Sequence, residues 1–443
     1  MIVMKRSFLT AALILAAFAC LGWHDSSRLA STRERNSRLL AEAASLGIVP
    51  DPANPWRQML ANRKRESQPS LTAAEYIAFA KEMDAKQKQG SESQLSEEES
   101  MKRVVAMMER LSSLNADELK HLIAELRTSA ELDGDARDGA VNRALFSLAS
   151  NHPQAALAFL IKSDETLVDR SMRTGFIGTA LSGWAKDDPV GAVKWVQQQS
   201  DQHPNLITDE VKRPLIVSVA GQDPKLAFQA LDDLKFKYHS IAVASIMSAA
   251  KTPAARTDAL QALREYTTGL TDARKRDKAL GAGLSSLAEH AARENFQQGS
   301  QWIDSAKLSP AELQSLGSSI SAHNIQTPDT GRWVEWLGNR VPSEKTSDRI
   351  SGMIDAWTQK DYIEAGKWLT STPDGPTKQA AVRGYVQAVA AYEPETAAQW
   401  AMTISSEKDR AQALRQIYQK WPKNDPVGKA AAEAFADQHG IKR

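Results

Sequence analysis

The side chains that could do chemistry in this sequence are its eight histidines and its 54 aspartates and glutamates. The His-Glu-x-x-His spacing, which places two zinc ligands on one face of a helix, does not occur among them. Glu289, His290 and Glu294 do form a carboxylate–imidazole cluster on one expected helix. Their spacing favours a solvated helix face with an i,i+4 pair over an acid–base site. We therefore expect no catalytic residues, no metal site and no cofactor.

A run of small residues at 281–286, Gly-Ala-Gly-Leu-Ser-Ser, could suggest a phosphate-binding loop. It lacks the Gly-x4-Gly-Lys-Ser/Thr spacing in which backbone amides and a lysine hold the phosphates. The run also lies inside a helical pattern, where small residues let two helices approach closely. Close helix packing is the better interpretation. No Gly-x-Ser-x-Gly elbow for a serine nucleophile is present.

Charge and cysteine content exclude further classes. Lys+Arg is 55 and Asp+Glu is 54, so the formal net charge is +1. A nucleic-acid-binding protein usually carries a strong basic excess, so no nucleic-acid partner is expected. Cys20 is the single cysteine. The remainder of the chain therefore cannot form an intrachain disulfide or a cysteine-based metal site.

Residues 135–443 repeat a helix-start pattern that must position any functional side chain. In its clearest copy, Asp188-Pro189, an acidic residue precedes proline, Ala192 follows three residues later and Trp195 six residues later. Nine copies follow one another at spacings of 32 to 37 residues, the length of one helical hairpin. The residues at the proline position are Pro153, Pro189, Pro224, Ala259, Phe296, Thr330, Tyr362, Pro394 and Pro426.

Helix capping explains why this pattern recurs. Proline is tolerated at the first helical position, where its missing N–H would have no intrahelical partner. An Asp or Asn just before it accepts hydrogen bonds from the free amides of the first turn. Seven of the nine preceding residues are Asp or Asn, and the full set is His152, Asp188, Asp223, Asp258, Asn295, Asp329, Asp361, Glu393 and Asp425. We expect each of these seven to cap the second helix of its hairpin.

Eight of the eleven tryptophans fall on two positions of the repeat. Five lie six residues beyond the helix start, and three lie five residues before it. This concentration indicates packing between repeats, and we expect Trp195, Trp302, Trp368 and Trp400 to be buried and equivalent. Trp333 departs from the pattern, since it stands where most copies carry alanine. Local repacking is one interpretation. The other is an exposed indole in the concave groove, which makes Trp333 the candidate partner-binding residue.

The pattern resembles the tandem helical-hairpin proteins grouped as TPR-like or HEAT-like, including exported bacterial repeat proteins with Trp…Asp-Pro-x-x-Ala-x-x-Trp units and no assigned activity. The resemblance covers residues 135–443 and concerns architecture, because the tetratricopeptide consensus itself is not met. It implies an all-α fold, a right-handed-type α-solenoid of about nine hairpins. The last copy has Lys429 at the small position and Ala432 at the bulky one, as expected of a terminal capping helix.

The first 23 residues have the composition of a membrane-targeting segment. Lys5 and Arg6 precede an uncharged apolar run from Phe8 to Trp23, and Ala17-Phe18-Ala19 fits the small-x-small rule for cleavage before Cys20. A cleaved signal peptide and an uncleaved anchor both remain open, because the run is slightly short for a span of about 20 residues. A lipoprotein attached through Cys20 is less favoured, because Phe18 occupies a position that usually carries a small residue.

Two regions lie between the targeting segment and the repeat array. Residues 24–70 are polar and proline-containing and are expected to be a flexible tether, and residues 71–134 hold helices with a Ser/Glu-rich linker. The N-terminal lysine and arginine would stay in the cytoplasm, placing the rest in the periplasm, either free or anchored in the inner membrane by residues 7–23. Membrane contact is expected only through residues 1–23.

Three functions fit these expectations, the least specific being a purely structural component of the cell envelope. The favoured one is a non-catalytic cell-envelope scaffold that binds a protein or peptide in the groove of the solenoid, since extended concave surfaces suit that task. The alternative is a carbohydrate-active α/α-toroid enzyme, in which tryptophans line a cleft and two carboxylates act as acid and base. Nine units with an atypical last helix favour an open array over a closed toroid.

Overall fold

The structure is a computed structural model that describes residues 71–89 and 97–441. This part of the chain is all-α, 79% helical, and contains 21 α-helices and no strand. The all-α expectation is thus confirmed, but the helix count is larger than nine hairpins provide. Three helices, α3 to α5, precede residue 134. The expected targeting segment at 1–23 and the tether at 24–70 lie outside the described residues.

The first three described helices are α3 (Ala73–Gln89), α4 (Glu97–Ser113) and α5 (Ala116–Thr128). A capping box begins α5, because Asn115 accepts from the amides of Asp117 and Glu118 while the Glu118 side chain accepts from the Asn115 amide. One face of α5 is apolar at three- and four-residue intervals and is buried. All three helices pack against α6 (Gly134–Asn151).

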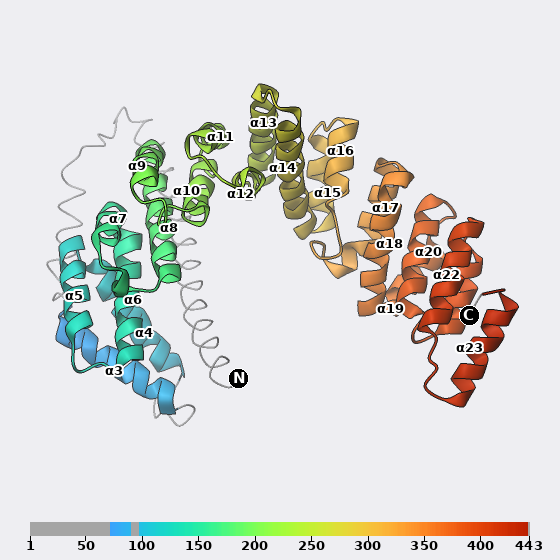
Figure 1. Ribbon diagram of the computed structural model, residues 1–443, viewed down its shortest axis with the longest axis horizontal. Helices are drawn as coiled ribbons and strands as arrows, with labels where there is room; N and C mark the ends of the chain where they lie inside the picture. The colour runs from blue at the N-terminus through green and yellow to red at the C-terminus, as the bar shows by residue number, and fades with distance from the viewer. Residues whose placement is uncertain (1–70, 90–96, 442–443) are drawn as a thin grey trace, which may run out of the picture. The chain divides into compact units, whose positions relative to one another are not determined.

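The remaining helices follow one another with short connections (Figure 1). They are α7 (Pro153–Lys162), α8 (Arg170–Asp187), α9 (Pro189–Gln202), α10 (Asp209–Ala220), α11 (Pro224–Asp233), α12 (His239–Ser248), α13 (Pro253–Gly269), α14 (Ala273–Arg293), α15 (Phe296–Ser305), α16 (Pro310–Gly317), α17 (Thr330–Arg340), α18 (Ser343–Lys360), α19 (Tyr362–Ser371), α20 (Pro376–Val389), α21 (Pro394–Met402), α22 (Glu407–Lys420) and α23 (Pro426–Gln438). Single 3-10 turns precede α8 and α17, at Glu165–Leu167 and Thr327–Asp329.

Helix contacts in the described residues are local in sequence. Every extensive contact joins helices no more than three apart in chain order, and the largest join alternate helices such as α8 with α10 and α18 with α20. The core therefore continues from one helix pair to the next. No helix among residues 71–89 and 97–441 has the length and apolar content needed to cross a membrane.

Helix capping follows the sequence pattern at five of the seven expected Asp or Asn positions. Asp188, Asp223, Asn295, Asp361 and Asp425 each accept a hydrogen bond from a first-turn amide of the following helix. His152 and Glu393 make no such bond, although α7 and α21 begin beside them. His152 instead lies 2.8 Å, through Nε2, from the carbonyl oxygen of Leu114.

The fourth expected helix start is wrong. Asp258 lies inside α13, whose first residue is Pro253 and whose cap is the Thr252 hydroxyl, bonded to the Ala255 amide. The spacing between starts is therefore 29 residues from Pro224 to Pro253 and 43 from Pro253 to Phe296, instead of 32 to 37. The physical reason is that α13 is longer than α11, with 17 residues against 10. The additional residues extend α13 toward the N-terminus, so its start comes earlier than the repeat period predicts.

Asp329 also departs from its expected role. It makes no side-chain cap on α17. Its Oδ2 atom instead accepts a hydrogen bond of 2.9 Å from the backbone amide of Phe296, the first residue of α15. Asn295 already accepts from the Gln298 amide of the same turn. The start of α15 is thus satisfied by two side chains, one of them from beyond the next helix.

Gly283 shows why the small-residue run at 281–286 is helical. The run lies within α14, and a Cβ atom on Gly283 would come within 2.4 Å of the Leu263 side chain on α13. The interpretation as a helix-packing surface is confirmed. The absence of a side chain lets the two helices approach closely.

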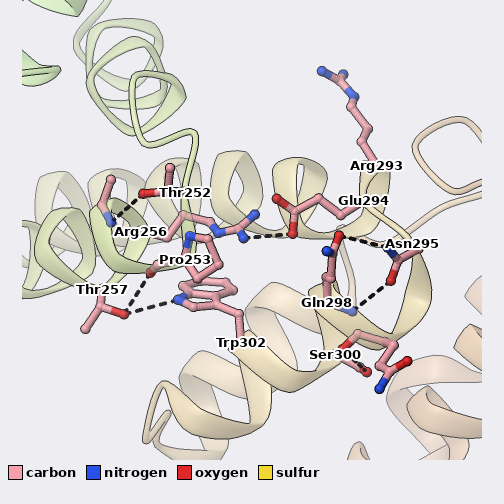
Figure 2. A network of polar contacts seen from close by, with 12 residues as sticks. Thr252, Pro253, Arg256, Thr257, Arg293, Glu294, Asn295, Gln298, Ser300 and Trp302 are labelled. Atoms are coloured by element: carbon pink, nitrogen blue, oxygen red, sulfur yellow. Dashed lines mark hydrogen bonds and ion pairs between the residues drawn. The ribbon is translucent and has the colours of Figure 1, made fainter. Parts of the chain in front are cut away.

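A buried arginine joins α13 to the helices after it (Figure 2). Arg256 is fully buried, with Nη2 2.8 Å from Glu294 Oε2 and its guanidinium 5.0 Å from the centre of the Trp302 ring. Its Nε and Nη1 atoms have no partner among the described residues. Arg256 stands three residues beyond the true start of α13, where other copies of the pattern carry a small residue. Its charge is balanced by Glu294 and the indole face.

Candidate functional site

Three tryptophans on alternate helices bind acceptors on an earlier helix through their indole nitrogens. Trp302 Nε1 lies 3.3 Å from Thr257 Oγ1. Trp336 Nε1 lies 3.3 Å from Asp304 Oδ1, and Trp368 Nε1 lies 2.9 Å from Glu335 Oε1. Each bond joins a helix to the one two places before it in the chain. An indole N–H can only donate a hydrogen bond, and in these three tryptophans a side-chain oxygen accepts it. We call these three residues the junction tryptophans.

The recurring tryptophans are less equivalent than expected. Trp302 and Trp336 are 3% and 7% exposed, whereas Trp195, Trp368 and Trp400 are half-buried against the core. Aromatic contacts also differ. Trp195 meets Trp184 edge-on with ring centres 6.4 Å apart, and Trp368 lies 5.9 Å from Trp357. The expectation that Trp195, Trp302, Trp368 and Trp400 are equally buried is therefore wrong.

Trp333, the candidate partner-binding residue, is fully buried, so the interpretation as an exposed indole in a groove does not agree with the structure. Its ring packs edge-on against Phe296 and Trp336, with ring centres 5.1 and 5.6 Å away. The Nε1 atom is buried without an acceptor in the described part of the chain. Gly299 allows this placement, because a Cβ atom on it would lie 3.1 Å from the Trp333 ring. Local repacking is the interpretation that agrees with the structure.

Trp400 differs from the junction tryptophans. Within residues 71–89 and 97–441 no oxygen accepts a hydrogen bond from the Trp400 indole nitrogen. Unlike the unpartnered indole nitrogens of Trp184 and Trp333, this nitrogen is not buried. Glu335 stands 33 residues before Trp368, and the residue 33 before Trp400 is Lys367. Lysine has donors only, and the Lys367 ammonium is paired with Glu364 at 2.7 Å. The acceptor present at the preceding junction is thus replaced by a cation.

Trp400 lines a pocket of about 550 Å³ between the beginning of α20 and the end of α21. The volume is in the range of small-ligand sites, about 300–1,000 Å³. Its walls carry a carboxylate, an ammonium group, a carboxamide, hydroxyl groups, a proline ring and an indole. The lining residues are Asp374, Gly375, Pro376, Lys378, Gln379, Trp400, Thr403 and Ser405.

Hydrogen bonds hold the two sides of this pocket together. The Gln379 carboxamide donates to the Thr403 carbonyl oxygen at 3.1 Å and accepts from the Ser405 amide at 2.7 Å. The loop after α21 is therefore fixed to α20 by one side chain. Lys378 Nζ lies 3.0 Å from Asp374 Oδ1, with the lysine side chain 16% and the aspartate side chain 92% exposed. The ammonium group is held in place, while its carboxylate partner stands in solvent.

The lining side chains offer an indole, an ammonium group, a carboxylate and several hydroxyl and amide groups to a ligand. Trp400 contributes an indole whose N–H has no acceptor in the described residues, and Lys378 contributes a positive charge. Asp374 is the single carboxylate among the lining residues, so the pocket does not present the carboxylate pair that the carbohydrate-active alternative requires. Across the described residues no group of three or more His, Cys, Asp or Glu side chains is placed to bind a metal ion.

The structure separates the cluster of Glu289, His290 and Glu294. Glu289 lies 3.5 Å from Arg293 on the same helix, whereas Glu294 pairs with Arg256 on α13. His290 is half-buried, and its Nδ1 atom has no partner in the described residues. The i,i+4 pair is therefore present with a different partner, and the face is less solvated than expected.

His290 lies among several cations. Burial lowers the pKa of its imidazole, and the charges of Lys251, Arg293 and Arg256 lower the pKa further, opposed by Glu294. The neutral imidazole is thus the form that the folded state favours.

No protein-family model matches the chain, and no curated protein matches it.

Proposed function

We propose that this protein is a non-catalytic scaffold of the cell envelope that binds a protein or peptide partner. In this proposal residues 135–443 form a right-handed-type α-solenoid, and residues 1–23 export the chain or anchor it. The sequential helix contacts support the solenoid, because repeat arrays are stabilised by contacts between adjacent units. The export half of the proposal depends on the pattern of Lys5, Arg6 and the apolar run that follows.

The observation that carries the binding proposal is the pocket beside Trp400. Half-buried tryptophans with a free donor are common energetic centres of protein interfaces, because the ring buries a large area and the N–H adds direction. Here the indole N–H has no acceptor in the described residues, an ammonium group lies in the same pocket, and the Gln379 side chain bonds the connecting loop. A preformed surface of this kind limits the ordering cost of binding.

Site-specific crosslinking tests the proposal. A photoreactive benzoylphenylalanine is placed at Thr403, which lines the pocket and whose side chain bonds only the carbonyl oxygen of Trp400. The matched control is Thr370, also exposed and bonded to a carbonyl of its own helix, Gly366, but outside the pocket. We expect a discrete crosslinked protein or peptide at 403 and not at 370 in intact cells. Equal labelling at both positions, or none at 403, contradicts the binding site.

A reporter fusion tests localisation separately. Residues 1–40 are joined to an enzyme that is active only after export. Activity is expected for the natural segment and its loss when a charged residue is placed within the apolar run. An inactive fusion that stays in the cytoplasm removes the envelope half of the proposal and leaves the binding half intact.

A further inference from the structure

The missing acceptor at Trp400 indicates what kind of group the pocket takes. At the three junction tryptophans the indole N–H meets an oxygen of the same chain, and at Trp336 and Trp368 that oxygen belongs to a carboxylate. At Trp400 the equivalent of Glu335 is Lys367. The donor therefore remains available, and a carboxylate is the group that the chain itself uses at two of the other positions.

The second group in the pocket favours the same chemistry. Lys378 is mostly buried, so its ammonium group has few positions to adopt. Its ion-pair partner Asp374 is 92% exposed, so water competes for that carboxylate and weakens the pair. An ammonium group has three donors, so Lys378 can bind a second carboxylate without releasing Asp374.

We propose that the pocket lined by Trp400 and Lys378 binds the carboxylate of an acidic side chain in a peptide or protein segment. One carboxylate oxygen accepts from Trp400 Nε1 and the other from Lys378 Nζ, and the apolar part of the acidic side chain lies beside the indole. This inference rests on the proposed function and specifies the partner as an acidic segment. A carboxamide of the same shape can accept from the indole but gains less from the lysine charge.

The test uses the full chain with ¹⁵N-labelled tryptophan and two capped peptides, acetyl-Gly-Glu-Gly-amide and acetyl-Gly-Gln-Gly-amide. Trp400→Phe identifies the Trp400 indole signal by its disappearance and retains an aromatic ring. We expect the glutamate peptide to shift this signal in a saturable manner and to bind roughly fivefold more tightly than the glutamine peptide, because charge-assisted hydrogen bonds are stronger. The signal of Trp368, whose donor is already occupied, should not move.

Three variants make the assignment specific. Lys378→Met should abolish the preference for glutamate, whereas Asp374→Asn should strengthen glutamate binding by removing the competing carboxylate. Trp195→Phe is the matched control, since its indole N–H also has no acceptor in the described residues but lies outside the pocket. It should leave binding unchanged. Unaltered thermal melting shows that each variant is folded.

Two outcomes overturn the inference: a Trp400 signal that the glutamate peptide does not move, or equal affinity for the two peptides. If crosslinking at Thr403 still captures a discrete partner, the binding function stands and only the acidic specificity is lost. If crosslinking at Thr403 also fails, the proposed function fails with it.

Discussion

Trp368 and Glu335, separated by 33 residues, are joined by a 2.9 Å hydrogen bond from the indole nitrogen to a carboxylate oxygen. The two residues lie on α19 and α17, which belong to successive repeats. Because Glu335 is exposed and Trp368 half-buried, the bond lies at the edge of the interface between the repeats. Trp400 and Lys367 occupy the corresponding places one repeat later, where no such bond can form.

A double-mutant cycle should detect this bond. Trp368→Phe and Glu335→Ala are each expected to lower the free energy of unfolding, with a coupling energy of about 1 kcal/mol between them. The corresponding cycle of Trp400→Phe and Lys367→Ala should give no favourable coupling. Chemical denaturation of the natural chain, the four single variants and the two double variants measures both cycles, and equal coupling in the two would contradict the geometry.

Asp188 should contribute to stability as a helix cap, while Asp258 should not. Asp188 Oδ1 accepts from the Gly191 amide at 2.8 Å, so Asp188→Ala is expected to cost about 1 kcal/mol. Asp258 is exposed in the interior of α13, so Asp258→Ala should change stability by less than about 0.5 kcal/mol. Thermal melts compare the two. A larger loss at Asp258 would restore the helix start expected from the repeat spacing.

The buried pair of Arg256 and Glu294 should respond unequally to removal of each partner. Glu294→Ala leaves a fully buried guanidinium without its carboxylate and should cost about 3 kcal/mol. Arg256→Met leaves a carboxylate that is 26% exposed and can reach water, and methionine fills much of the space. We expect this variant to lose about 1 kcal/mol. Urea unfolding would contradict this account if Arg256→Met were the more damaging change.

Acid should weaken the region around His290. Burial, Lys251, Arg293 and Arg256 lower the pKa of His290 in the folded state. The unfolded chain, with a histidine pKa of about 6.5, therefore binds the proton more readily. The contribution of His290 to stability is present above that value and decreases as the pH falls below it.

His290→Gln should reduce the loss of stability between pH 7.5 and pH 5.5, as measured by urea unfolding at both values. His121→Gln is the control, because His121 is 77% exposed and pairs with Glu125 on its own helix. If the glutamine variant at 290 loses as much stability on acidification as the natural chain, the imidazole is not responsible.

The sequence predicted those features that depend on local chemistry. Proline preceded by Asp marks the starts of α9, α11 and α23, because both residues act within one helical turn. The repeat period places a helix start at Asp258, whereas Thr252 and Pro253 carry the same local signal six residues earlier. A cap followed by proline therefore marks the start of α13 better than the repeat period does.

Features that depend on distant residues could not be predicted in this way. The burial of Arg256 requires Glu294, 38 residues later, and nothing in either neighbourhood indicates the pair. The pocket beside Trp400 is formed when Gln379 binds the loop at 403–405, across 24 to 26 residues. The register of Trp333 does not distinguish local repacking from exposure in a groove, because the space that buries it is provided by Gly299 and by the rings of Phe296 and Trp336.

The hydrogen bond from the Phe296 amide to Asp329 affects how such a chain can gain or lose repeats by recombination. A crossover that removed α17 together with Asp329 would leave α15 in place but with an unpaired amide at its first residue. The unit that can be exchanged here without loss of a hydrogen bond is therefore longer than one hairpin. The first amide of α15 needs Asp329, which is encoded after α16. Exchange of single hairpins should be tolerated best where the cap is supplied by the residue directly before the helix, as at Asp188 and Asp425.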